Sequence, residues 1–208
     1  MLSILALAAI GGGAFVLLRG GGEGGGGGEE RPPADLAWEV RFTKVVAVDE
    51  KPPQGRVDSA TEEISALMDE LYTTAFVDPA RWGGGGFPDL DSYFSGPAAQ
   101  RAVEDLEQLT LGSLAPRVAR VDPGASRLNI SVLVDEDSGM TAAIARAAFR
   151  ADARTKGGEK FKIFHRGSYL MEQVDGGWRI TGYDIEGEIN PSAGVGEPAP
   201  GPSAEATP

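Results

Sequence analysis

Residues 161–185 read FKIFHRGSYLMEQVDGGWRITGYDI, and the alternation of their side chains decides the class of fold. Apolar and polar residues alternate over 159–174, and the turn sequence at 175–177 then predicts a hairpin into a second strand. Apolar side chains after this turn change parity at Tyr183, which predicts a β-bulge at Gly182. The stretch is therefore expected to form two antiparallel strands.

The same period of two extends upstream of this hairpin. Residues 117–121 and 128–134 read as strands, separated by the turn sequence Asp122-Pro123-Gly124. Residues 141–154 fit a helix by their alanines and a strand by the spacing of their arginines. We favour a strand, because alternate alanines and an aromatic residue then share one face.

The first half of the chain has a different pattern. Residues 37–48 alternate as a strand does, and Ser59 with Glu62 forms a capping box that is expected to open a helix over 59–77. Helical spacing returns in two further stretches, 89–94 and 97–109. Helices followed by several strands predict an α+β fold, in which helices pack on a curved antiparallel sheet.

A family resemblance is carried by the helix 59–77, the helical region 89–109 and three closing motifs, GSYL at 167–170, DGGWRI at 175–180 and YDI at 183–185. In these features the chain resembles the nuclear-transport-factor-2-like (SnoaL-like) superfamily, and in particular its membrane-anchored actinobacterial type. The resemblance implies a cone, in which N-terminal helices wrap a curved antiparallel sheet. It implies no single activity, because this fold hosts isomerases, dehydratases, ligand binders and adaptor domains.

Composition divides the chain into four parts. Residues 2–18 carry no charged side chain and would span about 25 Å as a helix, so 1–19 is predicted to be a transmembrane anchor. The Gly-rich residues 20–35 are predicted to be a flexible linker. The Pro/Ala-rich residues 190–208 are predicted to be a disordered tail, which leaves 36–189 as the folded domain.

The layout predicts a single-pass protein of the cell membrane. Arg19 and Arg31 follow the anchor, and the positive-inside rule alone would keep the domain in the cytoplasm. We nevertheless expect an extracytoplasmic domain, because the N-terminal side is short and Glu23, Glu29 and Glu30 follow the anchor.

Composition also excludes several classes of function. The chain contains no Cys, which rules out thiol catalysis and Cys-based metal sites. Its net charge of −12 argues against nucleic acid as a partner. The acidic run 135–139 reads as a hairpin turn and not as a calcium loop, because positions 6 and 12 are Met140 and Arg146 instead of Gly and Glu. We expect no metal and no cofactor.

The single histidine, His165, is the candidate for acid–base chemistry. Enzymes of the superfamily that the chain resembles work in the apolar pocket of the cone, which is predicted here to be lined by Phe149, Phe161, Ile163 and His165. His165 would be a general base with Tyr169 or Tyr183 nearby, or else an inert, hydrogen-bonded imidazole. Since no paired carboxylate is apparent, no catalytic residue is predicted.

The other face of the same strands is predicted to be basic. It would carry Arg146, Arg150, Arg154, Lys160, Lys162, Phe164 and Arg166. Such a row can contact an acidic protein or anionic headgroups, or it is the solvated side of a sheet.

The function that these features predict is contact and not chemistry. We expect a membrane-tethered, non-catalytic module for protein interaction or scaffolding at the cell envelope. Its partners would be the membrane, through residues 2–18, an unknown envelope protein, and a second copy bound through the open sheet. The alternatives are a binder of a small apolar ligand in the cone and an isomerase or dehydratase that uses His165.

Overall fold

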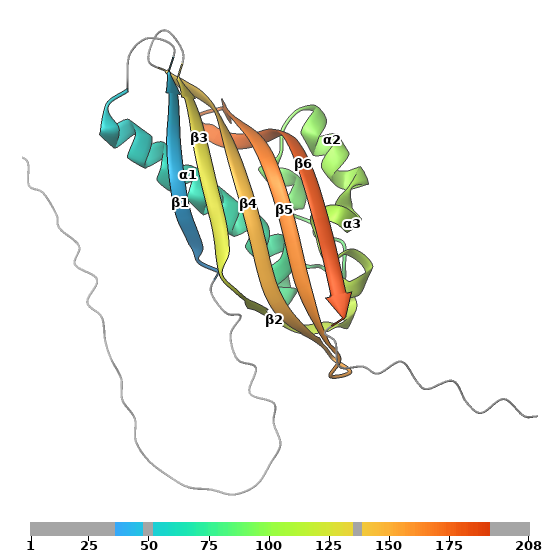
Figure 1. Ribbon diagram of the computed structural model, residues 1–208. Helices are drawn as coiled ribbons and strands as arrows, with labels where there is room; N and C mark the ends of the chain where they lie inside the picture. Colours follow the sequence, from blue (N-terminus) through green and yellow to red (C-terminus); the bar gives the residue numbers. More distant parts are fainter. Residues whose placement is uncertain (1–35, 48–51, 135–138, 192–208) are drawn as a thin grey trace, which may run out of the picture. The chain divides into compact units, whose positions relative to one another are not determined.

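The computed structural model describes residues 36–47, 52–134 and 139–191, which form a six-stranded sheet with helices on one face (Figure 1). The strands are β1 (Trp38–Ala47), β2 (Val118–Pro123), β3 (Ser126–Val134), β4 (Met140–Thr155), β5 (Lys160–Val174) and β6 (Gly177–Pro191). Their order is β1-β3-β4-β5-β6, and β2 pairs with β4 off this path. The predicted α+β class is confirmed.

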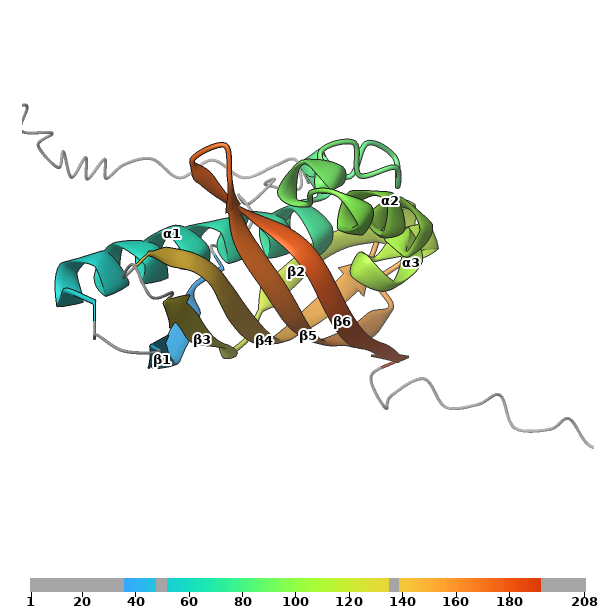
Figure 2. The same ribbon diagram turned by 90° about the horizontal axis from the view of Figure 1, so that it is seen from above.

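The described helices come from the segment between β1 and β2 and lie together on one side of the sheet (Figure 2). They are α1 (Gln54–Tyr72), the π-helical turn η1 (Thr73–Val77), η2 (Pro79–Arg81), η3 (Leu90–Tyr93), α2 (Pro97–Glu104), α3 (Leu106–Leu109) and η4 (Gly112–Arg117). We call the face of the sheet that they leave uncovered the outer face.

The start of α1 differs from the prediction. The helix begins at Gln54 after Pro53, so Ser59 lies inside it and does not cap it. The Ser59 hydroxyl donates instead to Glu63 Oε1, at 3.0 Å. The predicted capping box is therefore wrong, because the buried Val57 extends the apolar stripe of the helix by one more turn before Ser59.

The sheet is mixed, and its predicted antiparallel character is wrong at one edge. β1 runs parallel to β3, whereas the other neighbouring pairs are antiparallel. Alternation in a sequence determines which residues share a face, but it says nothing about strand direction. A parallel pair needs a long crossover connection, and the helical segment between β1 and β2 provides one.

The Asp122-Pro123-Gly124 sequence kinks the chain and does not reverse it. β2 pairs with residues 151–155 of β4, and β3 pairs with residues 140–148 of the same strand. Both therefore follow one edge of β4 in the same direction. The Gly124 amide donates to the Arg150 carbonyl at 2.7 Å and so keeps the kink attached to β4.

The strands on the C-terminal side confirm the predictions for that region. Residues 141–154 belong to β4, whose side chains alternate between buried and more exposed positions along most of its length. The predicted bulge is present, because Leu170 pairs with Gly182 and Met171 with Ile180, which leaves Thr181 as the extra residue. The helical spacing of residues 97–109 predicts a buried Val103, but this residue of α2 is 66% exposed.

Several predictions fall on residues that the structure does not describe. They are the anchor over 2–18, the linker, the C-terminal tail after Pro191 and the acidic run at 135–138. The predicted start of the tail at 190 is wrong, because residues 190 and 191 belong to β6. Among the described residues, no helix has both the length and the apolar character that crossing a bilayer requires.

Candidate functional site

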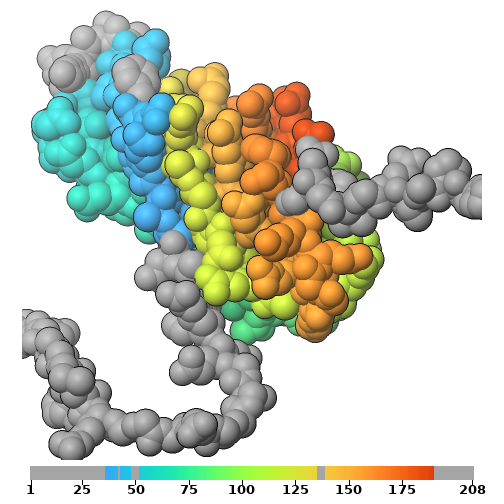
Figure 3. Space-filling view, turned by 60° about the horizontal axis from the view of Figure 1, so that its bottom comes forward, coloured from blue at the N-terminus to red at the C-terminus, as the bar shows by residue number. Residues whose placement is uncertain are grey.

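The seven residues predicted as an interaction surface lie together on the outer face of the sheet. We call them the basic face: Arg146, Arg150 and Arg154 on β4, and Lys160, Lys162, Phe164 and Arg166 on β5. The register of β4 and β5 makes them direct or diagonal neighbours. Figure 3 shows the side chains of β3, β4 and β5 side by side on this face. The six basic side chains are exposed and Phe164 is half-buried.

The charged groups of the basic face make few contacts within the domain. Lys162 Nζ lies 2.7 Å from Asp152 Oδ1, and the Arg150 guanidinium lies 5.5 Å from the centre of the Phe164 ring. Over residues 36–47, 52–134 and 139–191, the remaining arginines and Lys160 of the basic face form no ion pair. Their charges are available to a partner.

An acidic row borders the basic face on β6. Asp184, Glu186 and Glu188 are exposed on the same side of the sheet, where they pair with Ser168, Arg166 and Phe164 of β5. A groove of about 510 Å³ lies where the two rows meet. Its lining consists of Arg150, Phe164, Arg166, Glu186, Gly187 and Glu188. The outer face thus carries charges of both signs: the basic face, which has Asp152 between two of its arginines on β4, and the acidic row on β6.

The opposite face of β5 holds a buried polar cluster around His165. The imidazole is only 2% exposed, and its Nδ1 lies 2.9 Å from the hydroxyl of Tyr72 on α1. The same hydroxyl lies 3.1 Å from that of Tyr169. Phe76 and Phe149 stack with a centroid distance of 5.4 Å and close the apolar side of the cluster. Aromatic rings therefore fill this part of the space between α1 and the sheet.

Burial makes every member of this cluster neutral. It lowers the pKa of His165 to about 4, which the nearby Gln108 carbonyl partly offsets. It also raises the pKa of Tyr72 and Tyr169 well above the usual range of a phenol. If Tyr169 donates to Tyr72 and Tyr72 donates to Nδ1, the remaining imidazole proton is on Nε2.

That proton has no well-formed hydrogen bond. Nε2 of His165 is buried and without a hydrogen-bond partner among the described residues. A groove of about 440 Å³ reaches the ring between α3 and β6. It passes Gly187, where an added Cβ would lie 3.4 Å from His165 Cδ2 and 3.7 Å from the Gln108 carbonyl oxygen. The missing side chain at Gly187 keeps the groove open.

The predicted pocket residues divide between this groove and the filled interior. Ile163 and His165 line the groove, together with Phe76 and Ile185. Phe149 and Phe161 are buried and are not part of its lining. Phe149 is instead in ring contact with Phe76 and Tyr72.

Tyr183 belongs to a separate cluster. Its hydroxyl donates to Asp105 Oδ2 at 3.0 Å, and the Arg101 guanidinium lies 4.5 Å from its ring centre. Burial and the bond to Asp105 raise the pKa of Tyr183. Tyr183 thus fixes the helical layer to β6, and only Tyr169 of the two predicted tyrosines shares a hydrogen-bonded cluster with His165.

The sequence reasoning missed Tyr72, which contacts both His165 and Tyr169. The sequence does contain a signal for this residue, because helical spacing places Tyr72 on the buried stripe of α1 with Ile64 and Met68. A tyrosine in such a stripe needs a partner for its hydroxyl. That partner comes from β5, far away in sequence.

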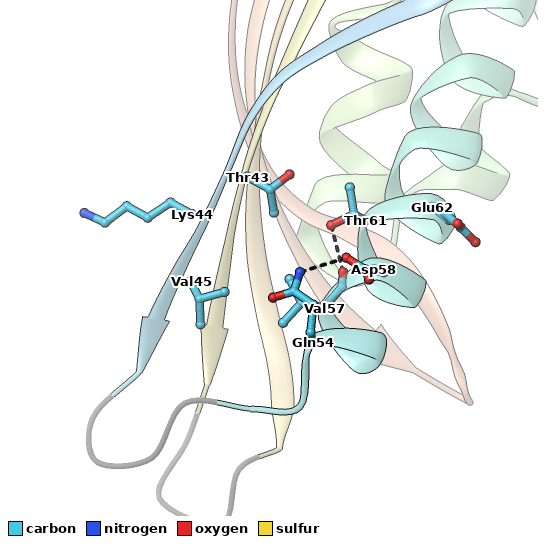
Figure 4. A pocket seen from close by; sticks show the side chains of 8 residues that line it. All are labelled: Thr43, Lys44, Val45, Gln54, Val57, Asp58, Thr61 and Glu62. Atoms are coloured by element: carbon cyan, nitrogen blue, oxygen red, sulfur yellow. Dashed lines mark hydrogen bonds between the residues drawn. The ribbon is translucent and has the colours of Figure 1, made fainter.

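A further groove, of about 550 Å³, lies between β1 and the first turns of α1 (Figure 4). Thr43 points toward α1 and Lys44 points away from it. The Gln54 amide donates to Asp58 at 2.9 Å, and the Thr61 hydroxyl donates to the Val57 carbonyl at 2.8 Å. These polar groups are satisfied within the helix and converge on no common point.

The described segments hold no group of three or more His, Asp or Glu side chains that could bind a metal ion.

No family model matches the chain, and no curated protein matches it. Two solved structures are similar to it, and both are hexachlorocyclohexane dehydrochlorinases. The type 2 enzyme (LinA) is 15% identical with a TM-score of 0.42, over 72% of this chain and 99% of that chain. The type 3 enzyme from Novosphingobium barchaimii LL02 is 15% identical with a TM-score of 0.42, over 69% and 97%.

Proposed function

We propose that this chain is a membrane-tethered, non-catalytic domain of the nuclear-transport-factor-2-like superfamily that binds a protein partner at the cell envelope. The observation that carries the proposal is the basic face, a row of six exposed positive side chains on a sheet face that no described helix covers. Charge rows of this kind steer partners and set the register in which they bind.

The charge of the rest of the domain supports this choice. The chain has a net charge of −12, so the basic face is a positive region on an acidic protein. Apolar side chains add contact area, because Phe164 within the basic face is half-buried and Leu170 beside it is 40% exposed. A surface with charged and apolar groups in one patch is typical of protein interfaces.

The buried cluster supports a role without chemistry. His165 is neutral, but over residues 36–47, 52–134 and 139–191 it forms no hydrogen bond with a carboxylate that would orient it as a base. Its neighbours Tyr72 and Tyr169 have raised pKa values and stay protonated. This arrangement stabilises the link between α1 and β5.

Reversing the charge of the basic face tests the proposal. The variant Arg146→Glu/Arg150→Glu/Arg154→Glu is compared with the unaltered full chain after extraction from the envelope in mild detergent. We expect the unaltered chain to elute in a complex larger than one chain with its micelle, and the variant to elute as a single chain. A control with reversals on the helical side, Glu62→Lys/Asp91→Lys/Glu104→Lys, keeps the complex. Equal elution of all three proteins contradicts the proposal.

The groove at Gly187 favours a second candidate function, the binding of a small, mostly apolar ligand. Its lining is mixed, and the groove reaches the unpartnered Nε2 of His165, which would donate to an acceptor on the ligand. The apolar lining residues are Phe76, Ile163, Phe164, Ile185 and Ile189, and the polar ones include Glu107, Gln108, Thr110, Glu186 and Glu188. A bound ligand raises the melting temperature, so screening lipids and polyketide-like compounds against the full chain tests this function. Gly187→Leu is the matched variant, because its side chain occupies the groove and removes the shift.

A further inference from the structure

The first strand, β1, lies at one end of the sheet and has a free edge. It pairs with β3 and with no other described strand. Alternate residues of such a strand direct their N–H and C=O groups away from the sheet. Within the part of the chain that the structure describes, no backbone hydrogen bond joins residues 38–47 to anything other than β3. The outward groups of β1 are therefore available to a further strand.

The two halves of this edge differ. The first half carries Glu39 and Arg41, which form an ion pair at 2.9 Å, and its register with β3 shifts after Val40. Charges and bulges of this kind protect a strand edge from pairing. Residues 43–47 follow in regular register with β3 and carry one charged side chain, Lys44. The second half is the part of β1 that can accept another strand.

Helix α1 forms a wall beside this second half. Its first turns extend past β1, beyond the edge of the sheet (Figure 1, Figure 2). The groove of about 550 Å³ lies between the strand and these turns, and Val45 and Val57 form the apolar part of its lining. Thr43 points across it toward α1 (Figure 4). A strand added beside 43–47 would thus be covered by α1 on its inner face.

The α1 wall of the groove is acidic. Asp58 and Glu62 are exposed and line it, and neither forms an ion pair with another described residue. The two residues are about 6 Å apart along the helix axis. Side chains at alternate positions of an extended segment lie about 6.8 Å apart on one face. Two basic side chains at alternate positions therefore match the two carboxylates.

We propose that this groove binds an extended peptide, which adds to β1 as a seventh strand and places two basic side chains against Asp58 and Glu62. Backbone hydrogen bonds to residues 43–47 supply affinity, and the carboxylates supply selectivity for a basic segment. Lys44 points away from α1 (Figure 4), so it does not repel these basic side chains. A compact ligand fits less well, because the polar side chains of the groove converge on no common point. The site is separate from the basic face on β4 and β5 and does not depend on it.

Synthetic peptides test the proposal on the full chain in detergent micelles. The fluorescein-labelled peptide TKTKTVTVT has lysines and valines on one face and threonines, which favour strands, on the other. We expect it to bind at least about tenfold more tightly than TETETVTVT, whose glutamates would face the carboxylates of α1. At saturation it should also slow hydrogen exchange in residues 38–47 and leave β4 and β5 unchanged. Equal affinities, or unchanged exchange in residues 38–47, overturn the proposal.

Methylation of the peptide backbone distinguishes strand addition from attraction between charges alone. Alternate amides of an extended peptide point to opposite edges, and only one edge pairs with β1. N-methylation of one alternate set of amides in TKTKTVTVT should therefore abolish binding, whereas N-methylation of the other set leaves binding unchanged. Equal binding by the two methylated peptides contradicts the strand geometry.

Charge reversal tests the position of the bound peptide. Asp58→Lys/Glu62→Lys should weaken binding of TKTKTVTVT at least about tenfold and should strengthen binding of TETETVTVT. The matched control, Glu63→Lys/Glu104→Lys, makes the same charge change at exposed helical residues outside the groove, and it keeps the preference for the lysine peptide. A control that weakens binding as much as the groove variant overturns the assignment.

Two further outcomes would assign the peptide or the edge elsewhere. Glu186→Lys/Glu188→Lys alters the acidic row on β6 and should leave binding unchanged, so loss of binding in this variant places the peptide on β6 and overturns the proposal. Without peptide, exchange in residues 38–47 should not depend on the concentration of the chain. Slower exchange at higher concentration would give the edge to a second copy and overturn the proposal as well.

Discussion

The buried His165 imidazole links the stability of the domain to pH. Burial lowers its pKa to about 4 in the folded protein, whereas an unfolded chain has a histidine pKa near 6.5. Between these values the unfolded state binds a proton that the folded state does not. The free energy of unfolding therefore rises as the pH rises from 4 to 6.5 and falls as the pH drops through that window.

A His165→Gln variant is expected to lose this dependence. Protonation of His165 changes the unfolding free energy of the unaltered chain by about 3 kcal/mol between pH 4 and pH 6.5. Urea unfolding of both full chains at pH 4.5, 5.5 and 7 gives the difference in unfolding free energy between the unaltered chain and the variant. This difference should shrink as the pH falls, since the carboxylates common to both chains cancel. A difference that stays constant would show that the imidazole is not neutral through burial.

Gly167 is needed because the Tyr169 ring lies over it. A Cβ at Gly167 would lie 2.6 Å from the Tyr169 hydroxyl oxygen, closer than real contacts allow. Gly167→Ala should displace Tyr169 from Tyr72 and lower the unfolding free energy by about 1–3 kcal/mol, as overpacking does. Gly182→Ala is the control, because its nearest neighbour is Leu170 Cβ at 3.7 Å. Equal urea midpoints for the two variants would contradict this account.

Single residues also show the limit of sequence reasoning. Parity on β5 correctly placed His165 on the inner, buried face, because alternation fixes which side of a strand a residue takes. Neither the hydrogen bond from Tyr72 nor the opening at Gly187 could be predicted. Both depend on how α1 and β6 meet β5, and local patterns carry no information about such long-range contacts.

The beginnings and directions of elements were predicted less well than their existence. The long helix, β4 and the hairpin of β5 and β6 follow from periods of 3.6 and 2 that extend over many residues. The Ser59–Glu62 pair is a local signal, and burial of the preceding turn against the sheet overrides it. The direction of β1 depends on its pairing with β3, which no pattern in 37–48 specifies.

The start of α1 can be tested by comparing two residues, Asp78, which caps a helical turn, and Ser59, which lies inside α1 and caps nothing. Asp78 does cap a helical turn, because its Oδ1 accepts the Ala80 amide at 3.0 Å. Asp78→Ala should cost about 1 kcal/mol, which lowers the melting temperature by about 2–4 °C in a chain of this size. Ser59→Ala should leave it unchanged or raise it, because alanine is the better residue inside a helix. A loss at Ser59 as large as that at Asp78 would restore the predicted capping box.

Charge is unequal between the two sides of the domain. The basic face occupies the outer side of the sheet, and exposed carboxylates such as Asp58, Glu62 and Glu63 lie on α1, on the other side. The sequence already separates these charges, since the acidic residues cluster in 49–107 and the basic ones in 140–180. The fold places the acidic stretch on the helical side, whereas the outer side carries the basic face together with the acidic row of β6.

The proposed location can be tested with a truncated variant and with a single introduced cysteine, since the chain has none of its own. If residues 2–18 anchor the protein, the full chain stays in the membrane pellet after alkaline carbonate extraction, and a variant without these residues does not.

If the domain lies outside the cytoplasm, a membrane-impermeant maleimide labels the Ser59→Cys full chain in intact cells as completely as in lysed cells. Ser59 suits this test because it is exposed on α1 and away from the basic face. Labelling that appears only after lysis would place the domain in the cytoplasm and exclude an extracytoplasmic partner.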